Sequence, residues 1–581
     1  MGPLYSPHDF LRPLIVCSRF GGLLRDTQAL RKARGAFFTP PELSRYLVEW
    51  AVRDRHDRVL EPSCGDAEFL LAAAVRLRAL DGAEPQLKDG ALHGVELHPE
   101  SAAVAADRLH AAGASAEIQV GDFFDVAPAP VYDAVVGNPP YVRYQNFTGS
   151  ARRKALESAL AEGVRLTGLA STWAAFTVHA SRFLKPDGRM GLVLPAELLT
   201  VNYAAPVRDF LLRRFASVRL VAFHERVFPG VLEDVVLLLA EGSGGATGFE
   251  IVHVRDLPAL GAVAAEAEHD AGAQTWSPRK PNTKWSRALV DHSLFADHDD
   301  LAASGSFVPL AAWGEVYLGG VTGANDYFTM TRHDADERGL PSAELLPISP
   351  PGSRHLRAFR FTRADWEHEV ASGARALLFR PDGQEPSPEA LRYIAEGERR
   401  GVHMAYKCRV RRPWWRVPLV RAPDLFLTYM NHRYPRLVAN EAGVHHLNSL
   451  HGVRLRPGHE TQGRELLPLA HLNSLSLLSA EVVGRAYGGG LLKLEPREAI
   501  RWLAPSPELV AAASAPLRIL RDRLIASPEH DIDDLISAVD DLLFTATLGL
   551  DASALARIRN ARHQMISRRT ARSGKARALT R

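Results

Sequence analysis

The 581-residue sequence is poor in cysteine and in long apolar runs. Its three cysteines, Cys17, Cys64 and Cys408, lie far apart and form no CxxC pair. This excludes a disulfide framework and a cysteine-based zinc site, and it indicates a reducing, cytoplasmic setting. No apolar run approaches the roughly 18 residues that span a bilayer, and the start lacks a basic segment leading into a long apolar core. We therefore expect neither secretion nor membrane insertion.

A large excess of charge of one sign is also missing, since the formal net charge is only +3. The distribution of charge is nevertheless uneven. The stretch 404–437 holds eight Lys or Arg residues and one acid, and the stretch 556–581 holds nine and no acid. Both stretches are candidates for contact with a polyanion. The chain is longer than one hydrophobic core usually supports, so we expect two domains.

The stretch 132–145 is the point around which the chain is organised. Val135 and Val136 predict the end of a buried strand, which two successive prolines must stop because proline fixes φ and offers no ladder donor. Where the chain leaves this strand, it presents the Asn138 amide, the Pro139 carbonyl and the Tyr141 ring. The two oxygens can accept hydrogen bonds from an amino group and the ring can stack on a flat molecule, so the pattern suits a planar substrate that carries an amino group. The alternative is a simple strand-ending turn, since Asn-Pro is a common turn starter.

Three predicted strands upstream also end in acidic groups. Glu61 follows 58–60, Glu96 ends 92–96, and Asp122 follows 117–120. Ligands of open α/β sheets bind at the carboxyl ends of the strands, so we expect one shared site there. The turn after the first strand carries acids and no lysine, unlike a phosphate loop. A cationic sulfonium or amino-acid group therefore fits it better than a triphosphate.

The motifs Phe-Phe-Thr-Pro-Pro, Glu-Pro-Ser-Cys-Gly-Asp, Gly-Val-Glu, Gly-Asp-Phe-Phe and Asn-Pro-Pro-Tyr occur in that order. Over residues 31–255 this series resembles the gamma-class DNA adenine-N6 methyltransferases of the TaqI type, which are typical of restriction-modification systems. The resemblance implies a class I S-adenosylmethionine-dependent methyltransferase fold, a Rossmann-like α/β fold with a mostly parallel seven-stranded sheet. It also implies a C-terminal α+β target-recognition domain. One departure is Ala67, where the family commonly has a second glycine.

The resemblance further implies roles for single residues. Glu96 is expected at the cofactor ribose, and Asp122 and Phe123 at its adenine. The full set of expected S-adenosylmethionine contacts is Thr39, Glu61, Ser63, Cys64, Gly65, Glu96, Asp122, Phe123 and Pro140. The expected catalytic residues are Asn138, Pro139, Tyr141 and Phe228, the two rings holding the target base between them. No metal is expected, and a core phenylalanine is the alternative for Phe228.

The target base cannot be reached inside a duplex, so it must be flipped out. Cytosine C5 methylation needs a cysteine nucleophile that follows a proline, and none of the three cysteines does. Cytosine N4 methylation stays open, although those enzymes more often have serine where this chain has Asn138. Methylation of an RNA base or a protein glutamine stays open as well, and so does a DNA-specificity protein with an inactive methyltransferase fold.

We divide the chain into a catalytic domain (1–255), a connector (256–305), a target-recognition DNA-binding domain (306–545) and a basic tail (546–581). The expected DNA contacts are Arg143, Lys407, Arg409, Arg411, Arg412, Trp414 and Trp415. A basic loop with inward-packed tryptophans is the alternative. We expect a monomer acting on double-stranded DNA, while the existence of a separate cognate restriction endonuclease stays open.

Overall fold

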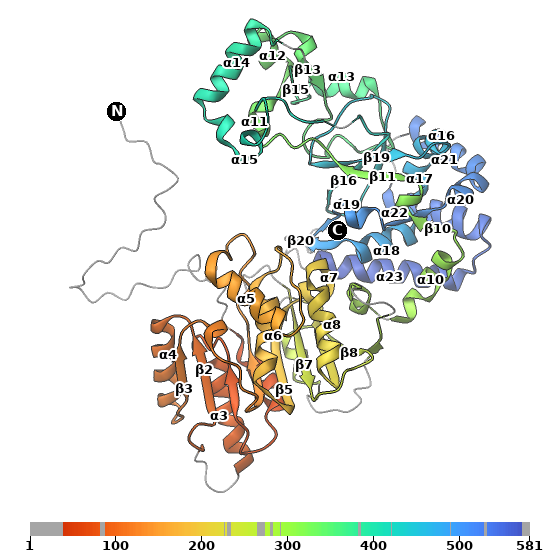
Figure 1. Cartoon of the computed structure of the whole chain (residues 1–581). Coiled ribbons are helices and arrows are strands. Elements are labelled where there is room, and N and C mark those ends of the chain that lie inside the picture. Colours follow the sequence, from red (N-terminus) through yellow and green to blue (C-terminus); the bar gives the residue numbers. More distant parts are fainter. Residues whose placement is uncertain are drawn as a thin grey trace.

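The computed structural model has two halves, each built around its own sheets (Figure 1). The residues it describes are 39–81, 87–225, 227–228, 234–263, 274–278, 283–290, 292–381, 385–419, 421–487, 490–527 and 531–571. Among the helices in these ranges, none combines the length and apolar character that crossing a bilayer requires.

One nine-stranded sheet organises the first half, in the order β3-β2-β1-β4-β5-β7-β6-β8-β9. Its strands are β1 (Val59–Glu61), β2 (Leu92–Glu96), β3 (Glu117–Val120), β4 (Tyr132–Gly137), β5 (Leu184–Pro195), β6 (Ser217–Phe223), β7 (Val235–Glu241), β8 (Phe249–Val254) and β9 (Gln274–Trp276). The neighbours β3, β2, β1, β4 and β5 are all parallel, whereas β7 is antiparallel to both of its neighbours.

Helices cover both faces of this sheet. They are α2 (Pro41–Ala51), α3 (Glu68–Asp81), α4 (Pro99–Ala111), α5 (Gly149–Ala161), α6 (Thr172–Ala180), α7 (Glu197–Thr200), α8 (Ala205–Arg214) and α9 (Leu257–Leu260). Apolar residues of α2, α3 and α4 form one core layer with the sheet, and those of α6 and α8 form the other. The strands are therefore buried between two layers, as expected of a parallel sheet.

The sheet exceeds the predicted seven strands by two. β8 pairs with β6 in parallel, and β9 pairs antiparallel with β8. β9 has only three residues, none of them fully buried, so the sequence offers no apolar alternation there from which to predict a strand. It lies within the stretch 256–305 expected to be a connector.

Small sheets with distant pairings build the second half. Their strands are β10 (Phe307–Pro309), β11 (Gly314–Leu318), β12 (Thr329–Met330), β13 (Leu345–Pro347), β14 (Arg360–Phe361), β15 (Leu377–Phe379), β16 (Leu425–Thr428), β17 (Met430–Asn431), β18 (Leu437–Asn440), β19 (Leu450–Leu455), β20 (Arg485–Tyr487), β21 (Leu491–Lys493) and β22 (Leu503–Pro505). The largest sheet has the order β11-β19-β16-β18-β14.

Helices complete the second half. They are α10 (Ala296–Ala303), α11 (Asn325–Phe328), α12 (Arg332–Glu337), α13 (Arg363–Ala371), α14 (Pro388–Arg399), α15 (Tyr406–Arg409), α16 (Glu460–Glu465), α17 (Leu467–Ala470), α18 (Ser474–Val483), α19 (Pro496–Ala499), α20 (Pro507–Ala512), α21 (Ser514–Ala526), α22 (Ile532–Asp540) and α23 (Ala552–Ala571). One apolar cluster includes residues of α17, α18 and α20–α23, and a second lies under α13, α14 and α15.

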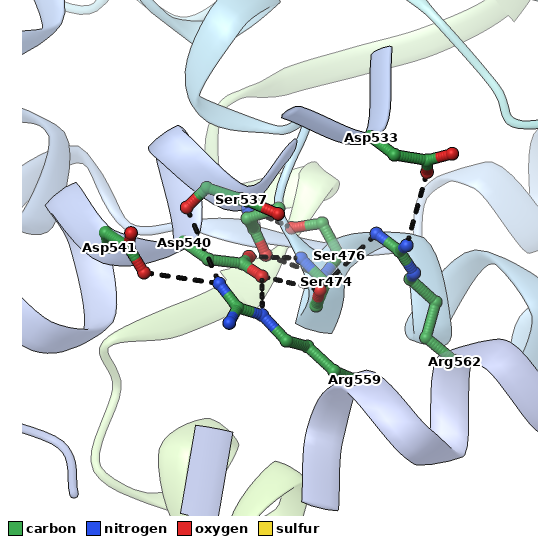
Figure 2. Close-up of polar contacts among 9 residues, drawn as sticks. Ser474, Ser476, Asp533, Ser537, Asp540, Asp541, Arg559 and Arg562 are labelled. Carbon is green, nitrogen blue, oxygen red and sulfur yellow. Dashed lines mark hydrogen bonds and ion pairs between the residues drawn. The ribbon is translucent and has the colours of Figure 1, made fainter. Parts of the chain in front are cut away.

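A buried carboxylate joins three of these helices (Figure 2). The Asp540 side chain, which is fully buried, accepts hydrogen bonds from the Ser474 backbone N–H and hydroxyl, both at 2.7 Å. It also accepts one from Arg559 Nε at 2.8 Å. Arg562 of the same helix as Arg559 reaches Asp533 at 3.5 Å. These bonds fix the first turn of α18 against α22 and α23.

The 20-residue helix α23 lies at the boundary between the two halves (Figure 1). Its Ala561 and Met565 belong to the same apolar cluster as residues of β5, β6 and α8. Leu478 of α18 belongs to that cluster too. Most of the described part of the stretch expected to be a basic tail is thus a helix that packs into the protein core. Residues 572–581 of the expected tail lie outside the described residues.

Arg569 of α23 forms a buried ion pair with Glu481 of α18. The two side chains are 4% and 5% exposed, and Arg569 Nε donates to both carboxylate oxygens at 3.0 and 2.9 Å. The guanidinium also donates to the backbone carbonyls of His432, Arg433 and Gly490. All five donors of this arginine point at acceptors, which satisfies the condition for burying its charge.

We expect Glu481→Ala to lower the free energy of unfolding by about 3–5 kcal/mol, because it leaves the Arg569 charge buried without its carboxylate. Urea denaturation would measure this loss, provided that the slope of unfolding free energy against urea concentration is the same in the variant and the wild type. The control is Glu367→Ala, which breaks an exposed pair with Arg363 on α13 and should cost less than about 0.5 kcal/mol. Equal effects of the two substitutions would contradict the role of the buried pair.

Candidate active site

The pairing of β1 with β2 and β4 brings the predicted polar groups to one edge of the sheet. Glu61 lies opposite Gly94, and Leu60 lies opposite Val135. All these strands run in the same direction, so their carboxyl ends meet there. Hydrogen bonds across the edge confirm the proximity: Gly65 N–H donates to Glu96 at 2.9 Å, and the Ser63 hydroxyl donates to the Asn138 carbonyl at 3.3 Å.

The turn between β1 and α3 is tight and left-handed at two positions. Gly65 has φ +51° and Ala67 has φ +66°. Ala67 is the one non-glycine residue with positive φ in the described ranges, and it stands where the resemblance led us to expect glycine. The backbone path of a two-glycine turn is therefore kept, at a steric cost of roughly 1–2 kcal/mol for alanine.

Cys64 lies under this turn as a packing residue. It is 2% exposed, and its backbone N–H donates to the Val95 carbonyl at 2.9 Å. A Cβ at Gly94 would stand 3.0 Å from its sulfur, so β2 passes as close as glycine allows. Burial raises the pKa of the Cys64 thiol, which argues against a nucleophilic role.

Glu61 is a buried carboxyl at the end of β1. It is 3% exposed and accepts the Leu70 N–H at 3.1 Å. Burial raises its pKa well above the usual range, and the nearby Asp66 and Glu68 add to the shift. Arg108 of α4 pairs with Asp66 at 2.7 Å and with Glu68 at 2.9 Å, which leaves Glu61 without an ion-pair partner among the described side chains. Glu61 is therefore suited to ionise when a cation arrives.

Glu96 and Asp122 each use their carboxylates to organise backbone at the site. Glu96 accepts the N–H groups of Gly65 and His98, both at 2.9 Å, one on each oxygen. Asp122 caps the short 3-10 helix Phe123–Asp125 by accepting the Phe124 N–H at 3.1 Å. A carboxylate has about four acceptor positions, so both side chains keep capacity for the hydroxyl or amino groups of a ligand.

The Phe123 ring packs into the core beside this site. It is 4% exposed, and its centroid lies 4.8 Å from that of Phe176, 4.6 Å from that of His179 and 5.1 Å from that of Phe183. Burial lowers the pKa of His179 to about 4, so this histidine is neutral and bonds the Phe123 carbonyl through Nε2 at 3.1 Å. Phe123 thus anchors the loop after β3, and its contact with a cofactor stays a prediction.

The Asn138 side chain is held by one end only. Its Nδ2 donates to the Thr39 hydroxyl at 3.3 Å, which orients the amide. Its Oδ1 is buried and has no hydrogen-bond partner among the described residues. A buried acceptor without a donor costs about 1–3 kcal/mol, and such groups are rare in native proteins. The amide oxygen is thus an oriented acceptor that no donor of the described residues uses.

The two prolines and Tyr141 are fixed by α6 and β5. The Thr172 hydroxyl donates to the Pro140 carbonyl and accepts the Val142 N–H at 2.9 Å. The Tyr141 hydroxyl donates to the Val193 carbonyl at 2.9 Å. No hydrogen bond between described residues uses the Pro139 carbonyl. Thr172 went unpredicted, since its only sequence signal is a Ser-Thr pair that opens a helical pattern.

Phe228 is 5% exposed and belongs to the apolar cluster on the α2 face of the sheet. Tyr141 packs against the same cluster. The two predicted aromatic residues thus contact the same apolar layer of the sheet, and Phe228 is mostly enclosed by apolar neighbours. Their role as the two sides of a base-binding slot stays a prediction.

The predicted DNA-binding residues separate into two groups. Arg143, Lys407, Arg409 and Arg412 are exposed. Arg411 donates to the Val321 carbonyl, and burial lowers its pKa. Trp414 and Trp415 pack against the core of the second half, with Trp414 Nε1 donating to Glu398 at 3.1 Å. The tryptophans are therefore packed inward, and the exposed ring of this segment is Tyr406.

Comparison with known families divides the chain into the same two halves. Residues 18–241 match the family described as N-6 DNA Methylase. Residues 282–544 match the family described as Type II methyltransferase M.Eco57I, C-terminal domain.

Individual relatives span most of the chain. The chain is 26% identical over 494 residues to the Type II methyltransferase M.XamI of Xanthomonas campestris pv. amaranthicola, covering 82% of this chain and 85% of that protein. It is 22% identical over 481 residues to M.AccI of Acinetobacter calcoaceticus, covering 81% and 84%. The solved structure of the Type IIL restriction-modification enzyme MmeI in complex with DNA aligns with a TM-score of 0.59 at 12% identity, covering 90% and 75%. These matches confirm the predicted resemblance to adenine-N6 DNA methyltransferases and the predicted fold class, and they are consistent with the gamma class.

We expect Ala67→Gly to leave the free energy of unfolding within about 1 kcal/mol of the wild type. Relief of the left-handed strain offsets the lost methyl burial and the greater freedom of glycine in the unfolded chain. Ala73→Gly in α3, which is equally buried, is the control and should cost about 2 kcal/mol. Denaturation of both variants tests this difference, and equal losses would show that Ala67 is not strained.

Proposed function

We propose that this protein, an adenine-specific DNA methyltransferase related to the Type II modification enzymes of restriction-modification systems, takes its methyl group from S-adenosylmethionine and transfers it to an extruded adenine beside Asn138. The observation that carries the proposal is the buried Oδ1 of Asn138 at the carboxyl end of β4, for which the described residues provide no hydrogen-bond donor. An exocyclic amino group is the donor that this oxygen lacks.

The chain's own groups then act on that amine. Asn138 Oδ1 accepts one N–H and the Pro139 carbonyl accepts the other. When both hydrogens are held on one side, the amino nitrogen becomes closer to tetrahedral. Its lone pair is then no longer delocalised into the ring. The lone pair forms the new N–C bond as the methyl group leaves its sulfur, and the amine gives up one proton. Thr39 keeps the amide oriented throughout, so the acceptors are in place before the base arrives.

The acidic end of the sheet fits a cationic cofactor. S-adenosylmethionine supplies a methyl group activated by a sulfonium charge. Glu96 would receive the ribose hydroxyls and Asp122 the adenine amino group, each with the acceptor capacity described above. Glu61 would face the cationic end. Thr39, Ser63, Cys64, Gly65, Phe123 and Pro140 complete the proposed surroundings.

Double-stranded DNA is the proposed substrate, and the adenine must leave the base stack at a cost of a few kcal/mol. Stacking of the extruded base on Tyr141, with Phe228 on its other side, would offset part of this cost. Lys407, Arg409, Arg412 and Arg143 would contact phosphates. We place the DNA-reading function in the proposed target-recognition domain, 306–545. We also propose a cytoplasmic location, a monomeric state and a separate restriction endonuclease as a partner.

We expect Asn138→Ala to reduce methyl transfer to DNA by about 10²–10³-fold, because one preorganised acceptor is removed. Binding of S-adenosylmethionine should stay within about threefold, since the amide acts on the amine. Transfer of labelled methyl to DNA and calorimetric cofactor titration measure the two effects. Asn202→Ala, an exposed asparagine in the same half, is the control. Full activity of Asn138→Ala, or label found in RNA or protein and not in DNA, would refute the proposal.

Cofactor binding should release a proton from Glu61. In the free protein burial raises the pKa of this carboxyl, so it holds its proton to higher pH than an exposed glutamate does, and a bound cation favours its ionised form. The affinity for S-adenosylmethionine should therefore rise with pH, by up to tenfold per pH unit between the pKa values of the bound and free protein. Calorimetry in two buffers of different ionisation enthalpy counts the protons. Glu61→Gln should abolish the release, and an unchanged proton count in that variant would contradict the linkage.

A further inference from the structure

Three large apolar side chains are exposed together at one short stretch of the second half. Met404, Tyr406 and Val410 are 62%, 65% and 61% exposed, and they lie within seven residues around α15. Single exposed apolar residues are common on protein surfaces and need no explanation. Three such residues within one short segment, with Met404 before α15, Tyr406 in it and Val410 directly after it, form a candidate contact surface. We call these three residues the apolar tip.

The base beneath the tip is fully packed. Cys408, between Tyr406 and Val410, is completely buried. A Cβ at Gly323 would stand 2.7 Å from Lys407 Cβ, so the loop before α11 presses directly on α15. Arg411 donates to the Val321 carbonyl on the other side of the tip. The three apolar side chains cannot turn inward, because the space below them is taken.

Trp414 anchors the segment that follows the tip. A Cβ at Gly397 of α14 would stand 2.7 Å from its ring, and its centroid lies 5.6 Å from that of Tyr327 and 6.1 Å from that of Phe328. The chain is thus packed against the second half at Cys408 and again at Trp414, on both sides of Val410. Such packing limits how far the exposed residues can move when they contact a partner.

Cations surround the tip. Lys407 Nζ lies 5.6 Å and Arg409 Cζ 6.0 Å from the centroid of the Tyr406 ring, and Arg412 is exposed beside them. The nearest acids on α14 are already engaged, Glu396 with Arg400 and Glu398 with Trp414. A suitable partner carries negative charge on its surface. Its interior is apolar and can be reached by one inserted side chain.

We propose that the apolar tip is a wedge that enters between base pairs of the bound DNA, unstacks one step and bends the duplex, while Lys407, Arg409 and Arg412 hold the flanking phosphates. The inference rests on the proposed function, because it requires duplex DNA as the substrate. In Figure 1, α15 lies on the edge of the second half that is turned toward the catalytic half. DNA that contacts both halves would therefore pass near α15.

A lipid surface is the other partner with anionic charge over an apolar interior. Interfacial membrane binding uses a long amphipathic face that lies flat on the bilayer. Here α15 has four residues, and the tip projects from a packed globular domain. Proteins that kink DNA use one or two apolar side chains as wedges between base steps, a size that matches the tip. DNA is therefore the partner that the geometry favours.

The test measures DNA bending directly. The methylated motif is first mapped by single-molecule sequencing of the expression host. A duplex carrying that motif, with a dye at each end and shorter than the persistence length of roughly 150 base pairs, then reports its end-to-end distance by energy transfer. S-adenosylhomocysteine replaces the methyl donor so that no turnover occurs. We expect the wild type to shorten this distance and Tyr406→Ala to abolish the shortening, with about tenfold weaker binding.

Two controls separate the wedge from charge and from general surface change. Lys407→Ala should keep the bend and reduce the slope of log affinity against log salt by about one. Leu391→Ala removes an exposed apolar side chain of α14 away from the tip, at 51% exposure, and should change neither quantity. Asn138→Ala should bend DNA like the wild type while failing to methylate it.

The outcomes are distinguishable. A wild type that methylates DNA but bends it no more than the Tyr406→Ala variant does overturns the wedge and leaves the enzyme function intact. A wild type that methylates no DNA overturns the proposed function instead. Cosedimentation with phosphatidylserine vesicles that is lost in Tyr406→Ala, together with unchanged bending, would assign the tip to a membrane surface and likewise overturn the wedge.

Discussion

Parallel pairing of β1 with β2 and β4 is the constraint on which the candidate site depends. The three strands share a direction and a register, so the residues that follow them fall close together although they are far apart in the chain. Glu61, Glu96 and Asn138 occupy this edge only because each stands where a buried strand ends. A shift of one residue in any strand would turn its polar end group to the opposite face. The apolar layers on both sides of the sheet fix that register.

The electrostatic character of the site depends on which of its acidic side chains form ion pairs and which do not. Arg108 of α4 pairs with Asp66 and Glu68, while burial raises the pKa of Glu61 and Glu96 accepts two backbone N–H groups. In the described part of the chain, neither Glu61 nor Glu96 forms an ion pair with a cationic side chain. The edge of the sheet thus offers acceptors and latent negative charge, which suits a cofactor that brings its own positive charge and its own hydroxyl and amino donors.

The parts of the fold that could be predicted from sequence are those set by local chemistry. The strand ends at Glu96 and Gly137 and the turn at Gly65 are encoded by short runs of apolar residues followed by glycine or proline. The second half is different, because its strands have two to six residues and pair across long distances, as β10 does with β22. The C-terminal arginines resembled a solvated tail because Glu481, the partner of Arg569, lies 88 positions away. Trp414 could not be separated from Tyr406 as the exposed ring, since which of them faces inward depends on Gly397 in another helix.

The shared core between the halves constrains how DNA can reach the site. Leu478 of α18 and Met565 of α23 lie in one apolar cluster with sheet residues of the first half, and Lys284 joins Glu498 across the same boundary at 2.8 Å. Close-packed interiors do not deform continuously, so this shared core limits the movement of α18 and α23 relative to the nine-stranded sheet. Under the proposed function, the target base would therefore travel to Asn138 while these elements stay in place. Extrusion of the adenine, aided by the proposed bending of the DNA, would supply that movement from the side of the substrate.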